Sequence, residues 1–162
     1  MSAVMGVVGC GNRLRGDDGV ALEVLEALRP VLPPHVLVVD ADGLAPWQWL
    51  DTIVGLKKAV IIDAAYLGKR PGAISRWRWN REIKREWPKS LGLGGSHGQG
   101  LWDALVQAEY AGYALPLIVV FAIEIDPDHT GWGQGISGPV RAAIAEVAAK
   151  VVKELQTCDL EE

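Results

Sequence analysis

The first 28 residues combine an apolar run, a glycine-rich acidic loop and an amphipathic helix, and this order constrains the fold more than any other feature. Residues 4–8 are apolar and predict a buried strand, which leads directly into residues 9–19, with the sequence GCGNRLRGDDG. After this loop, apolar side chains recur at helical spacing up to residue 28. A strand that turns tightly into a helix is typical of an open α/β sheet, in which ligands bind at the carboxyl ends of the strands.

The acidic residues of this loop indicate which kind of ligand it binds. Glycine-rich loops that precede helices commonly bind phosphate, but Asp17 and Asp18 would repel a phosphate and attract a cation. The dinucleotide-binding fingerprint also fails, because Leu14 replaces its third glycine. The loop therefore predicts a metal or electrophile site rather than a phosphate site.

The rest of the chain alternates between predicted strands and helices, which indicates a mostly parallel sheet covered on both faces. Further strands are predicted at residues 35–40, 59–63 and 117–125, an edge strand at 73–79, and helices at 46–53, 101–108 and 137–155. The sheet therefore has about five strands. We expect one domain over residues 1–162, with 156–162 as a flexible tail.

Composition and charge exclude several classes of function. The formal net charge of -4 argues against a nucleic-acid or membrane partner. No apolar run reaches the roughly 20 residues of a membrane span, and no signal peptide is evident. We expect Cys10 and Cys158 to be free thiols in a reducing compartment, which predicts a cytoplasmic protein.

Three acidic residues lie at or near predicted strand ends, and one histidine lies before a predicted helix. The acidic residues are Asp18, Asp40 and Asp63, and the histidine is His97. In a doubly wound sheet these positions share one edge, and two carboxylates with one imidazole suit zinc or nickel. Other interpretations stay open: Asp17 or Asp18 caps the first helix, Asp40 and Asp63 begin loops, and His97 is an ordinary cap or loop residue.

A second catalytic motif is present but lacks its structural context. Residues 94–98, GGSHG, fit the nucleophile elbow of serine hydrolases around Ser96, and Asp126 or Asp128 and then His129 follow in the expected order. An elbow requires a strand immediately before it, and residues 87–94 do not predict one. A serine hydrolase therefore stays an alternative, as does a non-catalytic metal- or nucleotide-binding α/β module.

Four segments resemble the nickel–iron hydrogenase maturation endopeptidases. These segments are the loop at residues 9–19, Ile62-Asp63-Ala64, the HGQGLWDAL sequence at 97–105, and GISGP at 135–139. Together they extend over most of the chain. One element departs from the family pattern, because Gly-Gly-Thr normally follows the aspartate at position 40, whereas here Ala-Asp-Gly-Leu follows it.

The resemblance implies a three-layer α/β/α sandwich with a mostly parallel, twisted sheet. It also implies an aspartic-type endopeptidase that removes a C-terminal extension from a hydrogenase large-subunit precursor after nickel insertion. The metal ligands carry over to Asp18, Asp63 and His97, and Asp18, Asp40 and Asp63 are the candidate catalytic residues. The expected cofactor is nickel carried by the precursor, which polarises the scissile carbonyl or activates a water. Asp40 or Asp17 would position that water or help to set the register of the substrate, and we expect a monomer.

Overall fold

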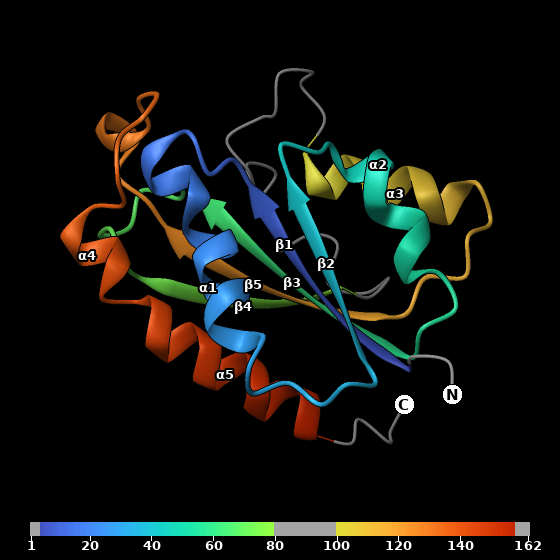
Figure 1. Cartoon of the computed structure of the whole chain (residues 1–162). Coiled ribbons are helices and arrows are strands. Elements are labelled where there is room, and N and C mark those ends of the chain that lie inside the picture. Colours follow the sequence, from blue (N-terminus) through green and yellow to red (C-terminus); the bar gives the residue numbers. More distant parts are fainter. Residues whose placement is uncertain (1–3, 80–99, 158–162) are drawn as a thin grey trace.

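A five-stranded, mostly parallel sheet forms the centre of the structure, a computed structural model that describes residues 4–79 and 100–157 (Figure 1). Within these residues the strand order is β2-β1-β3-β5-β4. The strands are β1 (Met5–Gly11), β2 (Val36–Asp42), β3 (Lys58–Ala65), β4 (Ile74–Trp79) and β5 (Leu117–Glu124). β1 pairs in parallel with β2 and β3, β3 pairs in parallel with β5, and β4 is an antiparallel edge strand.

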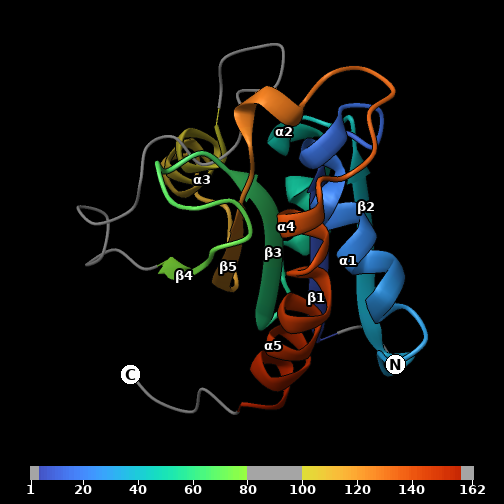
Figure 2. The same cartoon turned by 90° about the vertical axis from the view of Figure 1, so that its left-hand side faces the viewer.

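Helices cover both faces of the sheet, which confirms the predicted three-layer architecture. One face carries α1 (Val20–Leu28), α4 (Gly138–Arg141) and α5 (Ile144–Gln156), and the other carries α2 (Pro46–Trp49) and α3 (Leu101–Tyr110) (Figures 1 and 2). Short 3-10 turns, η1 (Gly16–Gly19), η2 (Leu50–Ile53) and η4 (Pro127–His129), complete the described part. No helix within it is long and apolar enough to span a bilayer.

The side chains of β3 alternate between two hydrophobic cores, because successive residues of a strand point to opposite faces. Val60, Ile62 and Ala64 pack in the core under α1 and α5. Ile61 and Ala65 pack in the core under α2 and α3. This alternation places Asp63, between Ile62 and Ala64, on the face covered by α2 and α3.

The structure divides two predicted helices, the one at residues 46–53 into α2 and η2 and the closing helix into α4 and α5. The spacing predicts one continuous helix from residue 137 to 155, whereas α4 ends at Arg141 and α5 begins at Ile144. Between them the Ala143 amide donates to the Val140 carbonyl at 3.0 Å, an i to i+3 bond that tightens the turn. The predicted apolar stripe is nevertheless buried at Val140 and continues along α5.

An ion cluster fastens α5 to the sheet at the end opposite the predicted site. Glu154 is 8% exposed and Lys58 5% exposed, and their charged groups lie 3.1 Å apart. The Arg76 guanidinium donates to both carboxylate oxygens of Glu154, at 2.9 and 3.0 Å. The cluster joins the start of β3, the edge strand β4 and the last turn of α5.

Candidate metal and active site

The glycine-rich loop between β1 and η1 closes on itself and so fixes the position of Asp18. The Asn12 amide donates to the Asp18 carbonyl at 3.1 Å, and the Asn12 side chain accepts a bond from the Leu14 amide at 2.9 Å. Gly11 adopts a φ of 134°, and a Cβ at this position would collide with the Asp18 carbonyl oxygen. The loop therefore requires glycine at position 11.

Asp63 lies near the carboxyl end of β3, and the strand register brings it beside β1. It follows Ile62, which pairs with Gly9, so Cys10 is its neighbour across the two strands. Cys10 packs in the core under α2 and α3, and so does Ala122, the β5 partner of Asp63. Asp63 is 7% exposed. Asp63 and Cys10 therefore share one face of the sheet.

Burial and mutual repulsion perturb the pKa values of three neighbouring groups. Burial, together with the negative charge of Asp18, raises the pKa of Asp63 to about 8. Burial raises the pKa of Asp18 to about 6, opposed by the nearby charge of Arg15. The pKa of the free thiol of Cys10 is also raised, first by burial and then by the charges of Asp63 and Asp18. The three side chains thus form one electrostatically coupled group at the predicted edge of the sheet.

Asp18 and Asp63 are suited to bind a cation. Neither carboxylate forms an ion pair with a basic side chain in residues 4–79 and 100–157. A divalent cation would supply the missing positive charge. The same ranges contain no group of three or more His, Cys, Asp or Glu side chains arranged to hold a metal. Of the three predicted ligands, Asp18 and Asp63 lie within the described residues, and His97 lies outside them.

The structure does not bring Asp40 together with Asp63, although the sequence predicts that all three acids share one edge. Asp40 pairs in register with Gly9, and a Cβ at Gly9 would contact Leu25 of α1. Asp40 therefore points to the α1 face, opposite to Asp63. The Arg13 guanidinium donates to both carboxylate oxygens of Asp40, at 2.8 and 3.2 Å. These bonds lower the pKa of Asp40.

Asp17 is a structural residue that fastens two distant loops. Its carboxylate is fully buried and accepts bonds from the Ser137 amide at 2.7 Å, the Ser137 hydroxyl at 2.8 Å and the Asp126 amide at 3.2 Å. It makes no side-chain cap on η1 or α1, so the helix-cap interpretation is wrong for this residue. Ser137 stands at the N-cap position of α4, but its hydroxyl bonds to Asp17 instead of capping the helix.

A family model described as hydrogenase maturation protease matches residues 22–154, which is most of the chain. The protein belongs to the hydrogenase maturation protease family. The family resemblance stated from the sequence motifs is therefore confirmed. The matched segment includes Asp40 and Asp63 but begins after Asp18.

Individual relatives agree with this family. A Methanocaldococcus jannaschii protein described as a candidate hydrogenase maturation protease is 41% identical over 73 residues, 43% of this chain and 47% of that protein. The aligned segment thus spans about half of that relative. The hydrogenase maturating endopeptidase HybD from Escherichia coli shares the fold with a TM-score of 0.77 and 23% identity, covering 96% of this chain and 93% of that one. A [NiFe] hydrogenase maturation protease HycI from Thermococcus kodakarensis gives 0.68 and 24%, covering 94% and 92%.

The described residues of the serine-hydrolase alternative have local roles in this family member. Ser96 lies outside the described residues. The Asp126 carboxylate accepts a bond from the Asp128 amide at 2.9 Å and caps η4. The His129 Nε2 lies 2.9 Å from the Gly135 carbonyl oxygen. These contacts lie within the loop that carries Asp126 and His129.

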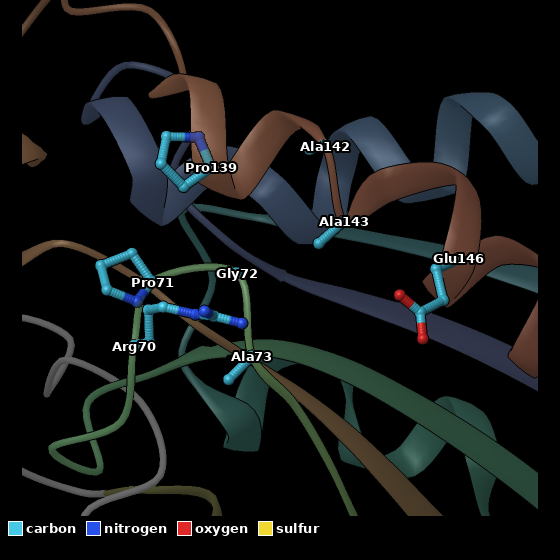
Figure 3. A pocket seen from close by; sticks show the side chains of 8 residues that line it. All are labelled: Arg70, Pro71, Gly72, Ala73, Pro139, Ala142, Ala143 and Glu146. Atoms are coloured by element: carbon cyan, nitrogen blue, oxygen red, sulfur yellow. The ribbon is translucent and has the colours of Figure 1, made fainter.

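A cavity of about 360 Å³ lies apart from the carboxylate pair. It separates residues 70–73 from the junction of α4 and α5 (Figure 3). Arg70 and Glu146 are its charged lining residues, and neither Asp18 nor Asp63 lines it. The cavity is therefore not part of the candidate metal site of this family member.

Proposed function

We propose that this protein is an endopeptidase that removes the C-terminal extension of a nickel-loaded hydrogenase large-subunit precursor. Membership in the hydrogenase maturation protease family supports the reaction and the class of substrate. The observation that carries the proposal is the pair formed by Asp18 and Asp63, two coupled carboxylates that form no ion pair with a basic side chain among the described residues. Such a pair is suited to receive a cation that the substrate brings.

In this proposal Asp18 and Asp63 bind the nickel of the precursor, and His97 is the third protein ligand. The two carboxylates differ in charge before the precursor arrives. With a pKa of about 6, Asp18 is mostly ionised at neutral pH, whereas Asp63, with a pKa of about 8, holds a proton. Nickel replaces that proton, so a nickel-free precursor docks more weakly. Nickel loading thereby becomes a condition for cleavage.

Cleavage itself requires water to attack the scissile carbonyl and the amine to leave with a proton. Bound nickel would polarise that carbonyl or lower the pKa of the attacking water. Asp40 would act on the precursor and not on the metal. It is exposed, it points to the α1 face, and Arg13 holds its carboxylate.

Incubation of the purified protein with nickel-loaded and nickel-free precursor tests this proposal. Mass spectrometry should show loss of the C-terminal extension from the loaded precursor only. Asp18→Ala, Asp63→Ala and His97→Ala should each lose cleavage, whereas Glu23→Ala, an exposed acidic residue on α1, should keep it. Wild-type cleavage rates in Asp18→Ala and His97→Ala would refute the metal site. Binding of the precursor without loss of mass would indicate a non-catalytic binding module.

A further inference from the structure

Two exposed apolar residues lie on neighbouring loops, one of which presents Asp18. Trp132 is 71% exposed and Leu14 is 62% exposed. Their loops are joined by a bond from the Gly133 amide to the Leu14 carbonyl, at 2.8 Å. Figures 1 and 2 both show the segment after η4 beside η1, at the carboxyl end of β1. We call Leu14 and Trp132 the apolar ledge.

The loop that carries Trp132 is held in a fixed shape despite its exposure. The Arg15 guanidinium lies 5.5 Å from the centre of the Trp132 ring, and its Nε donates to the Thr130 carbonyl at 3.3 Å. The Gly131 amide donates to the side chain of Gln134 at 2.7 Å. A ring held in this way loses little conformational entropy when a partner covers it.

Asp17 connects the ledge to the carboxylate pair through the backbone. It binds the amides at both ends of the segment that contains Trp132, those of Asp126 and Ser137, and it directly precedes Asp18. Leu14 is part of the same closed loop as Asp18. A peptide that places its scissile bond at Asp18 therefore passes close to the ledge.

We propose that the apolar ledge binds an apolar side chain of the hydrogenase precursor next to the scissile bond, and that Arg15 positions Trp132 for this contact. The inference rests on the proposed function and names the surface that selects its substrate. Tryptophan is enriched among the residues that contribute most to protein binding. A second copy of the chain is a poorer occupant, because a copy seated on the ledge would block the approach to Asp18.

Steady-state cleavage of the nickel-loaded precursor by the full-length protein tests the ledge. Trp132→Ala should raise KM about tenfold with little change in kcat, because a binding contact is lost rather than a catalytic one. Leu14→Ala should have a smaller effect in the same direction, and Trp132→Phe should restore most of the loss. Tyr110→Ala removes a side chain of α3 that is 95% exposed and serves as the matched control.

Direct binding separates failure of this inference from failure of the proposed function. Surface plasmon resonance should show the same tenfold loss of affinity for Trp132→Ala, with an unchanged circular dichroism spectrum. If the wild type cleaves and Trp132→Ala matches it in KM and Kd, the ledge is wrong and the function stands. If the wild type neither binds nor cleaves, the proposed function is wrong. A wild-type dimer that Trp132→Ala converts to a monomer would assign the ledge to a second copy.

Discussion

Replacing Asp63 by asparagine should stabilise the protein at neutral pH, even though it removes a proposed metal ligand. The carboxyl group is buried, and its pKa of about 8 lies well above its ordinary value of 3.8. Between these two values the folded protein holds a proton on Asp63 that the unfolded chain has lost. Folding therefore takes up a proton, and stability falls as the pH rises from 4 to 8. Asparagine has nearly the same shape and never ionises.

The size of this stabilisation follows from the difference between the pH of the experiment and the ordinary pKa of aspartate. At pH 7 this difference is about three pH units, which corresponds to a loss of folding stability in the wild type on the order of 4 kcal/mol. Asparagine loses part of this gain because it cannot reproduce every contact of the protonated acid. We therefore expect Asp63→Asn to stabilise the fold by about 2 to 4 kcal/mol at pH 7. The midpoint of thermal unfolding should rise by about 5 to 15 °C.

Urea unfolding at pH 4.5 and pH 7.5 measures the prediction. The gain of Asp63→Asn should be large at pH 7.5 and fall to about 1 kcal/mol at pH 4.5, because pH 4.5 lies less than one unit above the ordinary aspartate pKa of 3.8. Asp40→Asn is the matched control. Since Arg13 lowers the pKa of Asp40, ionised Asp40 favours the fold above that pKa. Its replacement should therefore destabilise the protein slightly, by less than about 1 kcal/mol. Equal pH dependence of stability in the wild type and Asp63→Asn would refute the argument.

Three further predictions test other parts of the molecule. Calorimetry should show that the isolated protein binds Ni²⁺ on the order of 100-fold more tightly at pH 8 than at pH 6, because Asp63 and Asp18 must lose protons. Asp63→Ala should remove most of this pH dependence, and a Ni²⁺ affinity of the wild type that does not change with pH would contradict the prediction. Glu154→Gln should lower the free energy of unfolding in urea by about 3 kcal/mol, since it breaks a buried ion pair with Lys58, yet leave the kcat of precursor cleavage unchanged. Ser137→Ala should lower the free energy of unfolding, measured by thermal unfolding, by about 1 to 3 kcal/mol, because the buried Asp17 carboxylate loses a hydroxyl donor. Ser75→Ala, which replaces a buried serine of β4 and leaves the contacts of Asp17 unchanged, is the comparison.

The strands could be predicted because each is a short apolar run that ends in a turn signal. The runs at 59–63 and 117–125 became β3 and β5, and the irregular pattern at 73–79 became the edge strand β4. The break between α4 and α5 could not be predicted, since Val140 and Val147 follow one helical stripe across it. Local hydrogen bonding interrupts the helix there without interrupting its apolar face.

The site could be predicted in part, because strand ends bring residues to one edge but do not assign them to a face. Asp18 and Asp63 are coupled as the topology predicts. Asp40 is not coupled to Asp63, because the face to which Asp40 points depends on the β1–β2 register, which the sequence does not specify. The bond between Asp17 and Ser137 joins residues 120 positions apart, and no spacing rule reaches so far. The role of His97 stays a prediction.

The pair formed by Asp18 and Asp63 differs from the other acidic residues of the fold, and the difference points to function rather than to packing. Asp17 accepts three hydrogen bonds, the buried Glu124 accepts bonds from the amides of Leu67 and Lys69, and Glu154 contacts two cationic side chains. The fold therefore satisfies a buried acid where its role is structural. Asp18 and Asp63 form no ion pair with a basic side chain among the described residues, and ionisation of Asp63 opposes folding. Local rules of stability are broken in this way chiefly at functional sites. Because a bound cation would remove that opposition, Ni²⁺ should raise the unfolding temperature of the wild type and leave that of Asp63→Asn nearly unchanged.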